Sequence, residues 1–356
     1  MKLLHIIESG KILNGIGTVV CRLSKEQTDL GIQVKIAALD RNLAYKDIDL
    51  PYTPTVKGLR QLIDEWHPNV IVFHSIWAMP YISMASLLNI RNIPYLVMMH
   101  GANSFENNRK SHWKKTFVNF FWFNNFLKRS SGIIYLSKTE YNNCLSKGLN
   151  HNNFILPNGC ELKKVNIASK KIHNPINIIY LGRLSIHHKG LDYLLDALDI
   201  LKSRNITGCH FNFYGNEHDT DTEYVKNRLR KLDSLAHFAG SVYGEKKNQV
   251  LNDADILILT SRYEGMPMGV LEALSHGVPC LLTPGTNMSE DVQNAHAGWE
   301  TQCDANIIAN DIMYAISELR KDPEIYFRSA YNLSKNYDWK TIAQQSFEIM
   351  KSIVNK

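Results

Sequence analysis

Apolar residues occur in short continuous runs along the first half of the chain, and polar segments that contain glycine separate these runs. A run of four to eight apolar residues between turn signals is typical of a strand that is buried on both faces. Apolar positions at helical spacing from Thr18 to Leu30 predict a helix that ends at Gly31, after a loop that contains Gly15 and Gly17. The strands predicted in this half are Leu3–Ile7, Val34–Leu39, Val70–His74, Tyr95–His100, Gly132–Ser137 and Phe154–Gly159.

The second half of the chain repeats the alternation of strand and helix after a polar, lysine-rich linker at Glu161–Asn174. Its predicted strands are Ile176–Leu181, Phe211–Gly215, Phe238–Val242, Ile256–Leu259 and Val278–Leu282. Its predicted helices are Leu191–Leu201, Glu223–Leu235 and Trp339–Val354. Alternating strands and helices indicate an α/β protein with parallel sheets and helices on both faces. A length of 356 residues is too long for one ordinary core and predicts two domains.

Composition and charge refine this picture. The apolar content of 44% and the charged content of 21% are typical of a soluble globular protein. The net charge of +6 is unevenly distributed. Residues 1–170 contain 21 Lys and Arg and 11 Asp and Glu, a net charge of +10. The remaining residues contain 19 Lys and Arg and 23 Asp and Glu, a net charge of −4. The basic first half suggests an anionic partner there.

The six cysteines are scattered without a C-x-x-C pair, which argues against a zinc site or a disulfide scaffold and indicates a reducing compartment. The N-terminal residues MKLLHIIESG lack the long apolar core and the cleavage site of a signal peptide. No run approaches the roughly 20 apolar residues of a transmembrane helix. We therefore expect a cytoplasmic protein.

The stretch Asp255–Pro279 carries the densest signal for a functional site. A buried strand leads into EGMPMGVLE, which begins at Glu264 and ends at Glu272, and a helix continues to Gly277. Glycines and a proline at a strand-to-helix turn let the backbone approach a ligand closely, and the free N–H groups of the helix start favour an anion. We expect Glu272 about two turns inside the helix, roughly 12 Å along its axis, so that the two carboxylates contact opposite ends of one extended ligand.

This stretch resembles the E-x7-E signature of retaining GT-B glycosyltransferases, glycosyltransferase family 4 in particular. The resemblance implies two Rossmann-like domains that face each other across a cleft, with acceptor on the first, sugar nucleotide on the second and a C-terminal helix that crosses back to the first. In the family, the first glutamate and the following backbone hold the donor sugar, the turn and helix start hold the diphosphate, and the second glutamate holds the ribose. The matching positions are Glu264, Gly265, Met266, Pro267, Met268, Gly269 and Glu272.

A second segment, GRLSIHHKG at residues 182–190, resembles the family's phosphate-binding segment. Its cations are Arg183 and Lys189, separated by five residues where four are common in the family. Fixed cations suit this position because negative charge grows on the nucleotide as it leaves. The resemblance also implies that Gly182 and Gly215 contact the donor, the latter near the nucleotide base.

Ligands of open α/β sheets lie beyond the carboxyl ends of the strands, and two predicted strands end in histidine, at His74 and His100. His100 matches the family's cleft histidine near the donor sugar, and the Gly15 and Gly17 loop, which is not a full G-x-G-x-x-G fingerprint, is expected to line the same cleft. The catalytic candidates are therefore His100, Arg183, Lys189 and Glu264.

The resemblance implies retaining transfer of a sugar from a nucleotide-sugar donor to a glycan or lipid-linked acceptor, in synthesis of a bacterial O-antigen, capsule or exopolysaccharide. We expect no cofactor and no essential metal, since Arg183, Lys189 and the helix start neutralise the diphosphate, and Asp219–Asp221 spells D-x-D only within a polar loop. The expected domains are 1–165 and 175–338, with the helix at 339–356. Two alternatives stay open: a GT-B sugar-nucleotide epimerase and a non-catalytic nucleotide-sugar-binding protein.

Residues 109–129, RKSHWKKTFVNFFWFNNFLKR, combine seven aromatic with six basic residues. One interpretation is a helix buried in the first domain. The other is an interfacial element that brings the enzyme to anionic lipid at the inner face of the cell membrane. Nucleic acid is not expected, because no nucleic-acid-binding motif is present.

Overall fold

The computed structural model describes residues 1–9, 15–40, 55–102, 122–216 and 221–355, and all structural statements concern these residues. The chain divides into two compact units, one formed by Met1–Gly159 with Trp339–Lys356 and the other by Cys160–Asp338. Each unit contains one six-stranded sheet whose strand pairs are parallel. This confirms the predicted α/β fold with two parallel-sheet domains.

Unit 1 has the strand order β2-β1-β3-β4-β5-β6. Its strands are β1 (Lys2–Ile7), β2 (Gln33–Ala38), β3 (Val70–His74), β4 (Tyr95–Met98), β5 (Gly132–Tyr135) and β6 (Asn153–Ile155). Its helices are α1 (Gly15–Asp29), α2 (Val56–Trp66), α3 (Met79–Ile90), α6 (Lys138–Asn142) and α15 (Trp339–Val354), and residues 122–128 are also helical.

Side chains of β1 alternate between the two faces of the unit 1 sheet. Leu4 and Ile6 lie in the core that α2 and α3 cover, whereas Ile7 packs with Val20 of α1. Helix α15 packs on α1 and also contacts β3. At its start, the ring of Trp339 lies over Gly159, where an added Cβ would come within 2.2 Å of a ring atom. The last helix of the chain is therefore part of the first unit.

Unit 2 has the strand order β12-β11-β10-β7-β8-β9. Its strands are β7 (Ile176–Leu181), β8 (Cys209–Tyr214), β9 (Ala236–Gly240), β10 (Ile256–Leu259), β11 (Cys280–Leu282) and β12 (Gly298–Glu300). Its α-helices are α7 (Ile186–Lys189), α8 (Leu191–Ser203), α9 (Thr222–Arg230), α10 (Gly244–Asn252), α11 (Met268–Ser275), α12 (Ser289–Asn294), α13 (Ala305–Lys321) and α14 (Pro323–Ser334). Four short 3₁₀ helices complete it, namely η1 (Ile167–Ser169), η2 (Asp233–Leu235), η3 (Pro284–Thr286) and η4 (Lys335–Tyr337).

Three element boundaries differ from the prediction in ways that affect the site. Helix α1 begins at Gly15, so Gly15 and Gly17 belong to its first turn instead of a loop. Strand β4 ends at Met98, and His100 follows it by two residues. Helix α11 begins only at Met268, because Pro267 before it is extended at φ −73° and ψ 118°. Glu272 consequently lies about one turn inside α11 and not two.

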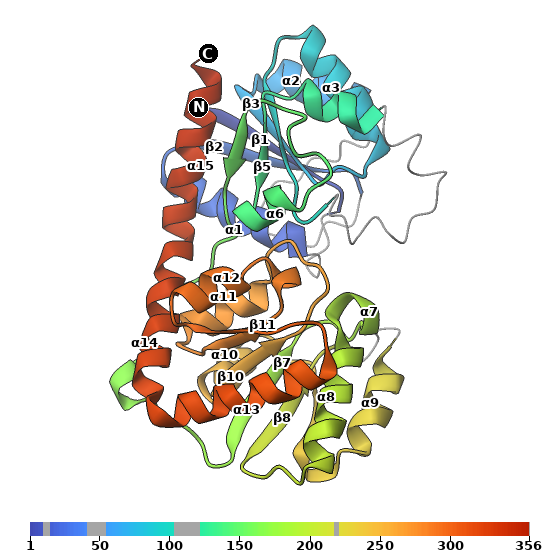
Figure 1. Cartoon of the computed structure of the whole chain (residues 1–356). Coiled ribbons are helices and arrows are strands. Elements are labelled where there is room, and N and C mark those ends of the chain that lie inside the picture. The colour runs from blue at the N-terminus through green and yellow to red at the C-terminus, as the bar shows by residue number, and fades with distance from the viewer. Residues whose placement is uncertain (10–14, 41–54, 103–121, 217–220, 356) are drawn as a thin grey trace. The chain divides into compact units, whose positions relative to one another are not determined.

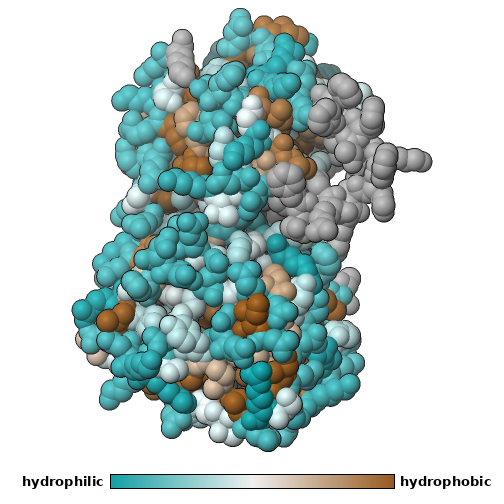
Figure 2. Space-filling view, viewed as in Figure 1, coloured by the Kyte–Doolittle hydropathy of each residue, from teal (hydrophilic) through white to brown (hydrophobic). Residues whose placement is uncertain are grey.

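Most of the aromatic-basic stretch, residues 109–121, lies outside the described residues. In its remainder, Phe123 and Phe126 are buried, whereas Trp122, Lys128 and Arg129 are exposed. The face in Figure 2 is largely hydrophilic, with apolar residues in small separate groups. In the part of the chain that the structure describes, no helix is long and apolar enough to cross a bilayer.

Candidate active site

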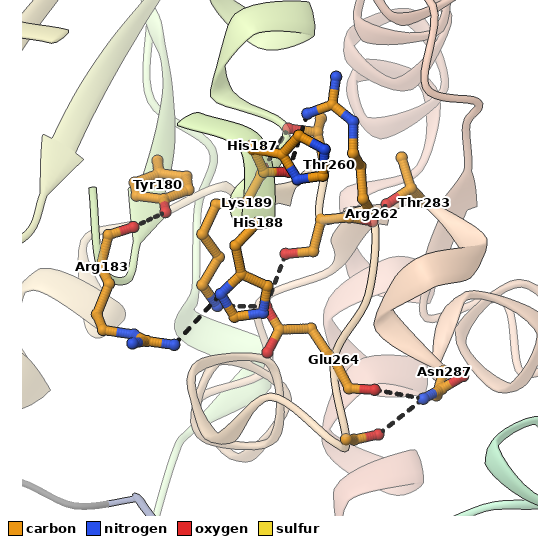
Figure 3. A network of polar contacts seen from close by, with 12 residues as sticks. Tyr180, Arg183, His187, His188, Lys189, Thr260, Arg262, Glu264, Thr283 and Asn287 are labelled. Atoms are coloured by element: carbon orange, nitrogen blue, oxygen red, sulfur yellow. Dashed lines mark hydrogen bonds and ion pairs between the residues drawn. The ribbon is translucent and has the colours of Figure 1, made fainter. Parts of the chain in front are cut away.

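The candidate site in unit 2 centres on an ion pair between Lys189 and Glu264 (Figure 3). The Lys189 ammonium group donates a short hydrogen bond to Glu264 Oε1, and the Ser261 hydroxyl donates another to the same oxygen at 2.8 Å. Only 10% of the Lys189 side chain and 11% of the Glu264 side chain are exposed, so water screens the pair weakly. The structure therefore brings together two catalytic candidates that are 75 residues apart in the sequence.

Electrostatics keep Glu264 ionised. Burial alone raises the pKa of its carboxyl group, but the charge and hydrogen bond of Lys189, the nearby His188 and the Ser261 hydroxyl together bring the pKa below its ordinary value. Glu264 is thus a carboxylate at neutral pH and accepts hydrogen bonds.

The backbone that carries Lys189 is held against the end of β10. Gly190 has a left-handed φ of +60°, and an added Cβ would lie 2.0 Å from the carbonyl oxygen of Thr260. The Thr260 hydroxyl donates to the carbonyl oxygens of Lys189, at 3.2 Å, and of Gly190, at 3.1 Å. Only glycine combines this backbone conformation with this close approach.

Arg262 fixes the same segment from the other side. Its guanidinium group forms two parallel bonds to Asp192, at 2.8 and 2.5 Å, and lies 4.2 Å from the ring centroid of Tyr193. It also donates to the carbonyl oxygen of His187 at 2.9 Å, and its backbone N–H donates to that of His188 at 3.0 Å. Arg262 therefore links the loop after β10 to α7 and α8.

Arg183 lies at the edge of this cluster, and His188 connects it to Glu264. The Arg183 Nη2 donates to His188 Nδ1 at 3.2 Å, because a guanidinium group has no acceptor. The proton of neutral His188 is then on Nε2, which lies 3.7 Å from Glu264 Oε1. Burial, Lys189 and Arg183 lower the pKa of His188, and its ring stacks on Tyr263 at 4.5 Å.

The start of α11, four residues after Glu264, presents free backbone donors. Among the described residues, the N–H groups of Met268 and Gly269 have no hydrogen-bond partner. An added Cβ on Gly269 would lie 3.2 Å from the carbonyl oxygen of Leu181, so glycine lets the helix approach β7. The Asn287 amide donates to the carbonyl oxygens of Glu264, at 2.6 Å, and of Gly265, at 3.0 Å. Free N–H groups at a helix start can bind an anion.

Glu272 accepts a bond of 2.6 Å from Lys247 of α10, and both side chains are partly exposed. Gly182 and Gly215 follow β7 and β8, and an added Cβ on Gly215 would come within 2.7 Å of the Gly182 carbonyl oxygen. The remaining predicted turn residues, Met266 and Pro267, lie between Glu264 and α11.

The other predicted site residues belong to unit 1. His100 has a left-handed φ of +52°, a conformation that is uncommon outside glycine. Gly15 is exposed and Gly17 is buried within α1. Asp221, the last residue of the D-x-D tripeptide, accepts a 2.7 Å bond from the backbone N–H of Ile186, whereas Asp219 lies outside the described residues.

Sequence reasoning did not identify four residues that contact the candidates, namely His188, Lys247, Ser261 and Asn287. His188 and Ser261 lie within the two segments that carry the resemblance, but at positions to which the resemblance assigns no role, whereas Lys247 and Asn287 make their contacts from other elements. The extra residue between Arg183 and Lys189 bears on the reach of Arg183, which in the structure bonds to His188.

Comparisons with known proteins cover both units. A family model described as "Glycosyltransferase Family 4" matches residues 13–164, and one described as "Glycosyl transferases group 1" matches residues 175–322. The solved structure of Anabaena HepE in complex with UDP has a TM-score of 0.79 and 20% identity over 99% of this chain and 100% of that chain. Sucrose-phosphate synthase from Thermosynechococcus elongatus has a TM-score of 0.77 and 15% identity, with 100% of both chains covered.

Curated relatives match over shorter stretches. The capsular polysaccharide biosynthesis glycosyltransferase CapH of Staphylococcus aureus is 32% identical over 41% of this chain and 41% of its own length. Mannosylfructose-phosphate synthase of Agrobacterium fabrum is 25% identical over 49% of this chain and 40% of its own length. The chain thus spans about two fifths of the length of these two relatives. Glycogen synthase of Mycobacterium tuberculosis is 23% identical over 80% of this chain and 69% of its own length.

Substitution of Gly190 by alanine tests how the Lys189 backbone is held. We expect Gly244→Ala, at φ +55° with no atom within 4 Å of the added Cβ, to lose about 1–2 kcal/mol of stability from the left-handed backbone alone. Gly190→Ala should lose a further ~1–3 kcal/mol, because its Cβ clashes with Thr260. Urea unfolding of both variants measures the difference, and equal losses would contradict the close approach.

Proposed function

Because this chain belongs to glycosyltransferase family 4 and has the GT-B fold, we propose that it moves a sugar from a nucleoside-diphosphate sugar to a hydroxyl group, with retention at the anomeric carbon. The donor is held by unit 2 and the acceptor by unit 1. HepE was solved in complexes with UDP and with UDP-glucose, which supports a nucleotide sugar as donor here.

One observation carries the proposal: Lys189 pairs with a single ionised carboxylate, Glu264, to which Arg183 is connected through His188. The helix that follows Glu264 in the chain, α11, begins with two free N–H groups. This arrangement has more positive than negative groups, and a diphosphate would complete it. Fixed donors that need no rearrangement stabilise charge most strongly where it develops during the reaction. Here that charge is on the leaving nucleoside diphosphate.

The proposed reaction breaks the bond between the anomeric carbon and the diphosphate oxygen, and forms a bond from the same carbon to the acceptor oxygen. The acceptor hydroxyl gives its proton to the departing phosphate oxygen on the same face of the sugar. Glu264, as a carboxylate, accepts hydrogen bonds from sugar hydroxyls. Its ion pair with Lys189 sets the distance between the sugar and the diphosphate.

We propose that no metal ion or cofactor takes part, because Arg183, Lys189 and the α11 N–H groups supply the positive charge that a metal would otherwise supply. Glu272 binds the ribose hydroxyls, and its pairing with Lys247 in the structure orients the carboxylate toward α10.

The acceptor in this proposal is a growing glycan or a lipid-linked sugar of a bacterial surface polysaccharide. Relatives that support this include CapH and the amylovoran biosynthesis glycosyltransferase AmsK of Erwinia amylovora, which is 28% identical over 40% of this chain. The enzyme would work in the cytoplasm. The exposed Trp122, Lys128 and Arg129, backed by the buried Phe123 and Phe126, support contact of unit 1 with an anionic membrane surface.

Removal of the two cations tests the diphosphate assignment. Screening of sugar nucleotides by thermal stabilisation identifies the donor, since a ligand at 100 times its Kd adds about 2.7 kcal/mol. We then expect Lys189→Ala and Arg183→Ala each to lower kcat/KM about 10- to 150-fold, which corresponds to ~1.5–3 kcal/mol for a lost charge-assisted bond. The assay measures release of the nucleoside diphosphate from the donor in the presence of acceptor. Formation of free epimer from the donor without acceptor would identify an epimerase.

The exposed cations Lys321 and Arg230 of unit 2 provide matched controls, because they lie on α13 and α9 away from the Lys189 cluster. Their alanine variants should keep full activity. Wild-type rates in both Lys189→Ala and Arg183→Ala would refute the assignment.

The two glutamates should affect different kinetic constants. Glu272→Ala should weaken nucleotide binding more than it lowers kcat, because a ribose contact is made in the ground state and the transition state alike. Glu264→Ala should mainly lower kcat. Isothermal titration with the nucleoside diphosphate measures the first effect. The control is Lys247→Ala, which removes the ion pair but keeps the Glu272 carboxylate, so a loss of affinity in Glu272→Ala alone reports ribose binding. Unchanged nucleotide affinity in Glu272→Ala would rule out the ribose role.

Vesicle co-sedimentation tests membrane contact. We expect binding to anionic but not to neutral vesicles, at low salt only, since each cation near the surface contributes roughly 1 kcal/mol and salt screens this attraction. Replacement of Lys110, Lys114, Lys115 and Lys128 by Gln should abolish binding. The same charge change in unit 2, at Lys202, Lys231, Lys246 and Lys321, should preserve it. Absence of binding to either vesicle type would leave 109–129 as an ordinary part of the domain.

A further inference from the structure

A continuous line of hydrogen bonds joins three histidines across three neighbouring strands of unit 1. His5 lies in β1, His74 ends β3, and His100 follows β4, and these strands are adjacent in the sheet. His5 Nδ1 lies 2.8 Å from His74 Nε2, and His74 Nδ1 lies 2.8 Å from His100 Nε2. His5 and His74 are 1% exposed, so the bond between them is shielded from water, and the bond from His74 to His100 is partly buried.

The end of this line at His5 is held by side chains of two helices, α1 and α15. His5 Nε2 lies 2.9 Å from Gln27 Oε1 of α1, and the Gln27 amide nitrogen donates to the Ser346 hydroxyl of α15 at 2.9 Å. The Ser346 proton goes to the carbonyl oxygen of Ala343 at 2.8 Å. The Ser346 oxygen must therefore accept, which orients Gln27 so that its carbonyl oxygen faces His5.

This anchor sets the direction of every bond in the line, because a neutral imidazole has one N–H donor and one acceptor nitrogen. Gln27 Oε1 can only accept, so His5 carries its proton on Nε2 and accepts at Nδ1. His74 then donates from Nε2 and accepts at Nδ1, and His100 donates from Nε2. The lone pair of His100 Nδ1 has no hydrogen-bond partner among the described residues.

All three rings are neutral at physiological pH. Burial lowers the pKa of His5 to about 4 and that of His100 to about 3, and it holds the pKa of His74 well below its usual value. The proximity of the rings to one another lowers the pKa values of His74 and His100 further, because a charge on one ring disfavours a charge on the next.

The backbone around His100 is also fixed. Its left-handed φ of +52° is followed by Gly101 at φ +78°. The Gly101 N–H donates to Glu140 Oε1 at 2.5 Å, and Glu140 itself is buried on α6. A non-glycine residue persists in such a conformation only where its surroundings impose it, and such positions cluster at functional sites.

We infer that Gln27, His5 and His74 are positioning residues that hold His100 in the Nε2–H tautomer, so that His100 offers a hydrogen-bond acceptor at Nδ1. The group that His100 recognises is then a donor, such as a sugar hydroxyl, and not a phosphate or carbonyl oxygen. The identity of that hydroxyl as part of a sugar substrate rests on the proposed function, whereas the tautomer does not.

Nitrogen-15 NMR of the histidine rings in the full-length protein tests the inference without any ligand. Long-range proton–nitrogen correlation distinguishes a protonated from an unprotonated ring nitrogen, and His100→Gln identifies the His100 signals. We expect His5, His74 and His100 each as a single Nε2–H tautomer at pH 7, whereas the exposed His67 provides a reference ring that no such line of bonds holds. A protonated Nδ1 on His100, or a mixture of tautomers there, overturns the inference.

Substitutions of Gln27 test whether it directs the line. Gln27→Lys replaces the acceptor by a donor and should move the His100 proton from Nε2 to Nδ1, three bonds away. Gln27→Glu retains the acceptor and should keep the wild-type tautomer. If Gln27→Lys does not fold, Gln27→Met removes the acceptor and should give His100 two tautomers in exchange. An unchanged His100 spectrum in the folded variants that lack the acceptor overturns the role of Gln27.

Activity adds a separate measurement. With a donor found by the thermal screen, Gln27→Met should lower kcat while the affinity for nucleoside diphosphate stays at the wild-type value, because the nucleotide-binding candidates lie in unit 2. If no sugar nucleotide stabilises the protein or reacts, the proposed function fails, and the NMR result still decides the tautomer of His100.

Discussion

A buried ammonium group requires a counter-charge, and the pair of Lys189 with Glu264 meets this requirement in unit 2. Loss of one partner would leave the other charge buried and unpaired, which typically costs 3–5 kcal/mol. The contacts around the pair hold its two residues in place. Gly190 lets α7 approach Thr260, and Arg262 connects the loop after β10 to α7, which follows β7. These loops follow different strands, so the pair fixes the ends of β7 and β10 relative to each other.

The same pair explains how unit 2 can bind an anion without rearrangement. Glu264 occupies one side of the Lys189 ammonium group, which has three donors, and leaves the others for a ligand. The N–H groups of Met268 and Gly269 are free at the start of α11, which begins only after the extended Pro267. In unit 1 the candidate residue His100 is held without an ion pair, by the line of hydrogen bonds from the neutral rings of His5 and His74. The two units therefore present cationic donors and a neutral acceptor, respectively.

All strands except β12 were predicted, because both faces of a parallel sheet are covered, which requires the continuous apolar runs seen in the sequence. Strand β12 has only the three residues Gly298–Glu300 and no such run. Boundaries were less predictable where one residue decides them. Pro267 reads equally well as the first residue of a helix or as the extended residue before it, and the structure has the second. Similarly, a loop was predicted at Gly15 and Gly17, yet they form the first turn of α1 despite the weak helix propensity of glycine.

Motif spacing identified Lys189 and Glu264, but it could not predict that they touch, because a contact over 75 residues depends on how β7 and β10 pair. The line from Gln27 to His100 was equally hidden. His74 and His100 attracted attention as polar residues near strand ends, whereas His5 lies within an apolar strand and Gln27 within an ordinary amphipathic helix. Only the order of strands in the sheet shows that they are neighbours.

Helix α15 gives unit 1 a property that its architecture alone does not suggest. Trp339 covers Gly159 and Ser346 receives the Gln27 amide, so a domain that begins at the N-terminus is completed by residues that the ribosome makes after all of unit 2. Domains of a growing chain generally fold as units, in the order in which they emerge. In this protein the whole of unit 2 is synthesised before unit 1 is complete. Unit 1 requires α15, which is made last, before Ser346 can orient Gln27 at the His5 end of the histidine line.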